Sequence, residues 1–174
     1  MKTIHPVLAG GALALACLLA PSVASAHATL EVREARAGST YKAVLRVPHG
    51  CDGEATRVLR VRIPEGMISV KPMPKAGWEL EIVTGPLARP YTSHGTEVTE
   101  GVVELIWRGE LLDAHYDEFV FRGRLTDAFP AGTTIHFPTV QECDNGAERW
   151  IEIPAEGRGA GDLRYPAPAL RIVE

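Results

Sequence analysis

The stretch LRVRIPEG, Leu59 to Gly66, indicates the fold class of this chain. Three apolar residues at alternate positions are separated by two arginines, and the run ends at Pro64-Glu65-Gly66. An apolar–polar period of two is typical of a strand with one buried face, and Pro and Gly mark a turn. The stretch therefore predicts a half-buried β-strand followed by a turn.

Strand patterns of the same kind recur along the chain, and helical patterns are almost absent after residue 26. Turn residues separate most of the runs at spacings typical of an all-β sandwich. We therefore predict one antiparallel β-sandwich domain, immunoglobulin- or cupredoxin-like, over residues 27–174. The other expected strands are Ala28–Val32, Thr40–Val47, Met67–Val70, Trp78–Thr84, Val102–Trp107, Glu118–Leu125, Thr133–Phe137, Arg149–Ile153 and Ala169–Val173.

Residues 1–26 have the features of a cleavable export signal. Lys2 precedes an apolar run from Val7 to Ala20, and the small residues Ala24-Ser25-Ala26 form a cleavage site. A lipoprotein signal ending at Cys17 is the alternative, but it lacks the expected leucine three places upstream. Cleavage after Ala26 predicts a periplasmic or extracellular protein.

The predicted mature chain is long enough for one domain with a hydrophobic core. It has 17 basic and 22 acidic residues, a net charge of −5 with neutral histidines. This acidity argues against nucleic acid or an anionic membrane surface as a partner, because both favour a basic protein surface. No second apolar stretch approaches the roughly 20 residues of a membrane span, so we expect none after signal cleavage.

The mature chain retains two cysteines, Cys51 and Cys143. Two cysteines in an exported domain most often form one disulfide, which is the pairing we predict. The alternative is a Cu(I) or redox site. Neither cysteine belongs to a C-x-x-C motif, and each lies in a turn-like context, PHGCDG or QECDNG.

Cleavage after Ala26 would make His27 the first residue. The α-amine and imidazole Nδ1 of an N-terminal histidine can close a chelate ring on one metal ion, which an internal histidine cannot do. Nitrogen ligands in a near-square arrangement favour Cu(II). A first-position histidine can also arise by chance, because signal peptidases accept most residues after the cut.

Alternation assigns two faces to the first strand. Ala28, Leu30 and Val32 form the apolar face, so His27 and Glu31 point the other way. Glu31 is four residues from His27, roughly 13 Å along an extended strand, and cannot easily bind the same ion. The first strand therefore leaves His27 available for a role outside the core.

The segment GAERWIEIP, Gly146 to Pro154, is the second candidate. If Ile151 and Ile153 face the core, Glu148 and Trp150 face away from it and could form an anionic ligand and an aromatic wall beside a metal. The alternative is that Trp150 packs under a loop as a satellite core residue.

The remaining sequence gives little support for catalysis. The histidines of the mature chain besides His27 share no ligand spacing; they are His49, His94, His115 and His136. The chain has no G-x-S-x-G, phosphate-binding glycine loop or H-E-x-x-H motif. We therefore expect a protein that is not an enzyme.

The mature chain as a whole resembles the YcnI-type copper-binding domain family. The resemblance is carried by HATLEV from His27, KPMPKAGWELE from Lys71, YDEFVFRG from Tyr116 and FPTVQECDNGAERWIEIP from Phe137. It implies an exported β-sandwich that binds one Cu(II) through a single-histidine brace, with a carboxylate and a tryptophan completing the pocket.

By position, the resemblance assigns the histidine to His27, the tryptophan to Trp150 and the carboxylate best to Glu148. Glu31 and the Cys51/Cys143 pair are not shared by every branch of that family, so the carboxylate stays open between Glu148, Glu31 or another residue. The implied function is Cu(II) capture, trafficking or homeostasis, with other periplasmic or membrane copper-handling proteins as partners.

Two other functions remain open. An oxidative copper enzyme of the lytic polysaccharide monooxygenase type also begins with histidine, but it needs a second histidine on the copper. The other is a metal-free β-sandwich interaction module, which would need neither copper nor a histidine ligand.

Overall fold

The computed structural model describes residues 27–155 and 157–174. The predicted signal peptide, residues 1–26, lies outside the described residues. The strands are β1 (Thr29–Leu30), β2 (Glu34–Arg36), β3 (Thr40–Val47), β4 (Thr56–Arg62), β5 (Met67–Pro72), β6 (Glu79–Ser93), β7 (Thr96–Leu111), β8 (Asp117–Leu125), β9 (Thr134–His136), β10 (Thr139–Cys143), β11 (Ala147–Trp150) and β12 (Ala169–Val173).

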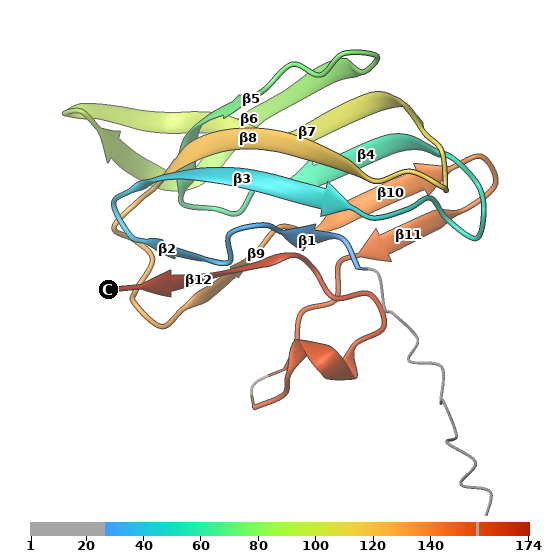
Figure 1. The fold of residues 1–174 in the computed structure, drawn as a ribbon. Coiled ribbons are helices and arrows are strands. Elements are labelled where there is room, and N and C mark those ends of the chain that lie inside the picture. The colour runs from blue at the N-terminus through green and yellow to red at the C-terminus, as the bar shows by residue number, and fades with distance from the viewer. Residues whose placement is uncertain (1–26, 156) are drawn as a thin grey trace, which may run out of the picture.

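These strands form three sheets (Figure 1). A four-stranded sheet has the order β1-β3-β8-β5, and a five-stranded sheet has the order β11-β10-β4-β7-β6. A small third sheet, β2-β12-β9, includes the parallel pair β2–β12. The pairings within the two larger sheets are antiparallel. The predicted β-sandwich is confirmed.

The alternation in LRVRIPEG has the predicted consequence. Leu59 and Val61 of β4 are fully buried, whereas Arg62 is exposed and Arg60 is half-exposed. Aromatic rings fill the space between the two larger sheets, with Trp107 of β7 and Phe119 of β8 in edge contact at a centroid distance of 5.5 Å. Burial of one face of each sheet is the main stabilising term of such a sandwich.

Four strands differ from the sequence prediction. Strands β2 and β10 were not predicted, and β6 and β7 continue past the Gly and Pro residues at which we placed their ends. The β6–β7 ladder shifts register between Pro86 and Tyr91, and β6 lies at the edge of its sheet, where a strand tolerates prolines. It then closes at His94-Gly95, both with positive φ, as a tight hairpin turn requires.

Two face assignments were wrong. Val32 is 50% exposed, because β1 ends at Leu30 and the alternation stops there. Ile151 and Ile153 are exposed rather than buried, and Trp150 faces the core with 4% of its surface exposed. Pairing of β11 with β10 sets this orientation, since Trp150 lies opposite the fully buried Thr139.

The only helix within the described residues is a 3₁₀ turn, Ala160–Asp162. No helix of that part of the chain could cross a membrane.

The predicted disulfide is confirmed. Cys51 and Cys143 are bonded with a Cα–Cα distance of 6.1 Å, which joins the loop after β3 to the end of β10. The two cysteines are 92 residues apart in sequence. The bridge therefore links the loop between the two larger sheets to the end of β10 that lies farthest from Thr139, the partner of Trp150.

Removing this disulfide should destabilise the protein. The double variant Cys51→Ala/Cys143→Ala is expected to lose about 2–4 kcal/mol of unfolding free energy, because the unfolded chain regains the freedom of a long closed loop. Urea unfolding measures the loss, and the wild-type protein reduced with dithiothreitol is the matched control. Equal midpoints for the oxidised protein and the variant would contradict this expectation.

Candidate functional site

His27 lies at the start of β1, where the first strand joins the four-stranded sheet. Thr29 and Leu30 pair with Arg46 and Leu45 of β3, and Leu30 and Ala28 are buried. These two apolar residues anchor the segment, which holds the half-buried His27 at the rim of the sandwich. The prediction that the core does not require His27 agrees with this position.

The imidazole of His27 meets the indole of Trp150. The two rings are in edge contact with centroids 5.4 Å apart and an interplanar angle of 87°. Residues 27 and 150, which are far apart in sequence, are therefore in contact. Trp150 is nevertheless a core residue, as the alternative interpretation held.

Trp150 is held in place from several sides. Its Nε1 donates a hydrogen bond of 3.2 Å to Oε1 of Gln141, which is 1% exposed. The ring of Tyr165 packs against its other side at a centroid distance of 5.4 Å. The position of the indole beside His27 is therefore fixed by packing and by a buried hydrogen bond.

Gln141 connects Trp150 to the disulfide-bonded loop. Its Nε2 donates to the carbonyl of His49 at 2.6 Å and contacts Oγ1 of Thr56 at 2.7 Å. A buried amide with these partners is well satisfied, which is what keeps such a polar group stable inside a core. Gln141 was not predicted from the sequence, since a lone Gln in QECDNG carries no periodic signal.

Glu148 lies two residues before Trp150, on the same face of β11. Its Oε2 atom is buried and has no hydrogen-bond partner within the described residues. A buried carboxylate oxygen without a partner is costly, and a metal ion is one of the partners that would relieve that cost. This atom is the unpartnered buried carboxylate oxygen on the strand that also carries Trp150.

The other candidate carboxylate, Glu31, is engaged elsewhere. Its Oε2 forms an ion pair of 3.1 Å with Arg46, which also contacts Glu118 at 3.4 Å. Glu31 is exposed on the outer face of the sheet. The Glu31 carboxylate therefore already has a cationic partner, whereas Oε2 of Glu148 has no partner within the described residues.

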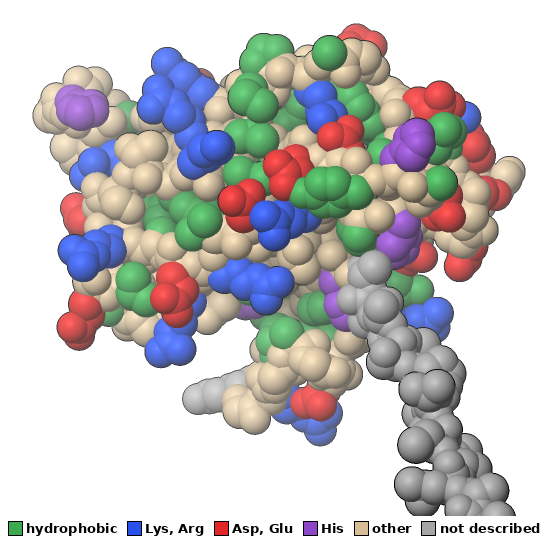
Figure 2. Space-filling model, viewed as in Figure 1, with side chains coloured by type: hydrophobic (Ala, Val, Ile, Leu, Met, Phe, Trp, Pro, Cys, Tyr) green, Lys and Arg blue, Asp and Glu red, His purple; other side chains and the backbone are tan. Residues whose placement is uncertain are grey.

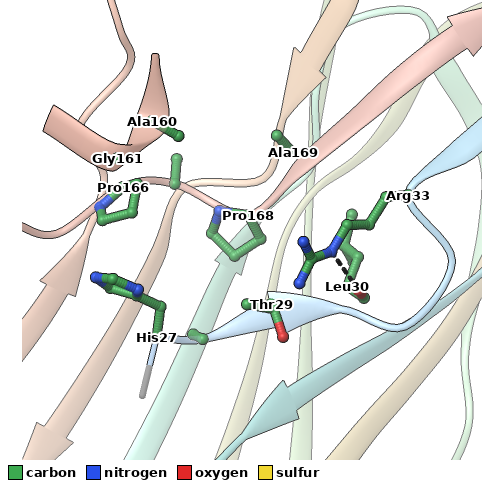
Figure 3. Close-up of a pocket in the computed structure, with 11 residues that line it drawn as sticks. His27, Thr29, Leu30, Arg33, Ala160, Gly161, Pro166, Pro168 and Ala169 are labelled. Carbon is green, nitrogen blue, oxygen red and sulfur yellow. Dashed lines mark hydrogen bonds between the residues drawn. The ribbon is translucent and has the colours of Figure 1, made fainter. Parts of the chain in front are cut away.

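A cleft of about 330 Å³ opens beside His27 (Figure 3). His27 and Arg33 lie on its β1 side, and Pro166, Pro168 and the 3₁₀ turn form the opposite wall. Glu152 fixes that wall: its carboxylate accepts from the Tyr165 amide at 2.9 Å, and its backbone bonds to residues 165 and 167. The cleft gives solvent and ions access to the histidine.

A second histidine, His49, follows the end of β3 by two residues. Continuing the register of Thr29 opposite Arg46 places His27 opposite residue 48, next to His49. The Nδ1 atom of His49 lies 2.6 Å from the Gly50 carbonyl. Sequence spacing could not indicate this neighbour, because the two histidines are on different strands.

Among the other histidines, His136 of β9 lies opposite Ala169 of β12, and Ala169 lines the cleft beside His27. Burial lowers the pKa of His136, which is half-buried in β9. Within the described part of the chain, no group of three or more His, Cys, Asp or Glu side chains is arranged to hold a metal. A site at His27 would therefore depend on its α-amine as well as on side chains.

The fold and the site define a β-sandwich in which the segment before the first strand brings a histidine into contact with a core tryptophan. The chain belongs to the family described as Domain of unknown function (DUF1775), whose model matches residues 27–172. An uncharacterised protein from Nocardia farcinica with an immunoglobulin-like fold is similar in structure, with a TM-score of 0.61 and 21% identity over 85% of this chain and 99% of that one. No curated protein matches the chain.

Proposed function

We propose that this is an exported Cu(II)-binding protein that captures or passes copper outside the cytoplasmic membrane, without catalysing a reaction on it. The metal is cargo, bound by His27 after cleavage following Ala26. The observation that carries the proposal is the buried Oε2 of Glu148, unpartnered within the described residues and two positions from the tryptophan that contacts His27.

The residues present fit Cu(II). An N-terminal histidine supplies an amine and an imidazole nitrogen, Glu148 supplies an oxygen, and Cu(II) favours such N and O donors in a near-square arrangement. Trp150 forms an apolar wall and holds the imidazole on one side. Gln141 acts through Trp150 as a positioning residue. Partners in this proposal are other copper-handling proteins of the periplasm or membrane.

An oxidative copper enzyme is the alternative that a specific observation favours. Such an enzyme needs a second histidine side chain on the copper, and His49, two residues after β3, is the candidate that an extension of the β1–β3 register offers. The capture proposal requires only one histidine and one carboxylate. We favour capture because Glu148 already supplies a buried oxygen on the strand that holds Trp150.

The test is a Cu(II) titration of the mature protein and of Glu148→Gln by calorimetry. The wild-type protein should bind one equivalent, and the variant should bind it about 10–100-fold more weakly, because a neutral amide replaces the carboxylate beside the metal. Glu31→Gln is the matched control and should leave the affinity unchanged. A wild-type protein that binds no copper, or a Glu148→Gln variant that binds it equally well, would contradict the proposal.

A further inference from the structure

A row of three cations crosses the outer face of the four-stranded sheet, away from the histidine. Lys42 of β3 lies directly opposite Arg122 of β8, and Arg122 lies directly opposite Lys71 of β5. All three side chains are exposed. Figure 2 shows basic and hydrophobic side chains gathered side by side over β3, β8 and β5.

These cations are distinguished by their alignment across three neighbouring strands, since other strand residues such as Arg62, Arg124 and Arg149 also lack an ion pair within the described residues. Within the described residues, Lys42, Lys71 and Arg122 have no ion-pair partner. The basic residues that do have acidic partners are Arg46, Arg57, Arg60, Lys75 and Arg108. Like charges directly opposite one another in a sheet are destabilising. This row of like charges therefore lowers the stability of the folded protein.

The row borders an apolar groove of about 350 Å³. Pro72, Met73, Pro74 and Val120 line it together with the three cations, and none of the lining residues is acidic. Met73 is 54% exposed and lines this groove between two prolines. The groove therefore combines a hydrophobic floor with a positively charged rim, which fits an anionic partner that carries an apolar group.

The concave shape of the groove favours some anionic partners over others. A concave groove accepts a projecting side chain, whereas a flat bilayer surface cannot enter it. Addition of a second copy as a strand on the β5 edge is disfavoured, since Pro72 and Pro74 have no N–H to donate. Carboxylates two residues apart in an extended peptide lie about 7 Å from each other, within reach of lysines two strand spacings, about 10 Å, apart.

We propose that the groove of Lys42, Arg122 and Lys71 with Pro72–Pro74 and Val120 binds an extended acidic segment of a partner protein. One apolar side chain of that segment occupies the groove, and its neighbouring carboxylates contact the cations. This surface is separate from the copper site, so the inference does not depend on copper binding.

The test uses the mature protein and a fluorescein-labelled peptide of eight alternating glutamate and leucine residues. Fluorescence anisotropy should give a Kd below about 1 mM at low salt, weakened at high salt because exposed charges are screened. The variant Lys42→Gln/Lys71→Gln should weaken binding about tenfold. The matched control Arg36→Gln/Arg171→Gln makes the same change of charge on the third sheet and should leave binding unchanged.

Each of the following results would overturn the proposal. Absence of saturable binding by the wild-type protein, or equal weakening in both double variants, would show that the groove does not recognise the peptide. Row-dependent binding to phosphatidylglycerol vesicles without peptide binding would assign the surface to a membrane. A thermal melt checks folding, and Lys42→Gln/Lys71→Gln should melt no lower than wild type because it removes repulsion.

Discussion

Extending the mature N-terminus by four residues, Gly-Ser-Gly-Ser, is expected to weaken Cu(II) binding by about 10²–10⁴-fold while leaving the fold intact. The extension places the α-amine of His27 in a peptide bond, so one of the two linked nitrogen donors is lost. Linked donors gain affinity because the second contact becomes intramolecular, and that gain has this magnitude. Calorimetric titration of the extended and the mature proteins measures the difference.

Four residues are needed because a new amine one or two places before a histidine can still chelate Cu(II) through the intervening amides. His27→Ala should show a similar loss. His94→Asn is the matched control: His94 is an exposed histidine at φ 50°, a conformation that asparagine tolerates. Affinity of the mature protein should also fall steeply below about pH 6, since amine and imidazole donors bind a metal only after losing a proton. An unchanged Cu(II) affinity of the extended protein would overturn the proposal that His27 binds copper through both its α-amine and its imidazole.

The sequence predicted the sandwich well because its signal is local. Alternation in LRVRIPEG and its counterparts identifies the strands, and β3 and β12 have the bounds that the patterns indicate. Strands β2 and β10 are short or lack a clean alternation, so their existence depends on neighbours far away in sequence. The cysteine pair followed from cell compartment and number alone, and the structure confirms it.

The site could be predicted only in part, because it depends on register. Sequence reasoning placed Trp150 on the outer face by assuming that Ile151 and Ile153 were buried, whereas pairing of β11 with β10 turns Trp150 inward. The resemblance to a known family still selected Trp150 correctly as the neighbour of His27. Gln141 and the approach of His49 follow from pairings between strands, for which the sequence carries no local signal.

Replacing Trp150 with alanine is expected to destabilise the protein by about 3–5 kcal/mol. The side chain is 4% exposed and contacts His27 and Tyr165, so its removal leaves a large cavity. The variant also removes the indole N–H from Oε1 of Gln141, a buried acceptor. Urea unfolding of the metal-free protein measures the loss, and a loss below about 1 kcal/mol would contradict the assignment of Trp150 to the core.

Trp150→Phe separates the core role from the polar one. Phenylalanine retains much of the buried area but cannot donate to Gln141, so we expect a smaller loss, about 1–3 kcal/mol, from the unpaired amide oxygen. If the indole also positions the imidazole of His27, both variants should weaken Cu(II) binding under conditions in which they remain folded. Full copper affinity in folded Trp150→Phe with normal stability would mean that neither the hydrogen bond nor the indole edge matters to the site. The two measurements together therefore assign Trp150 separately to the fold and to the metal, a distinction that His27 variants cannot make.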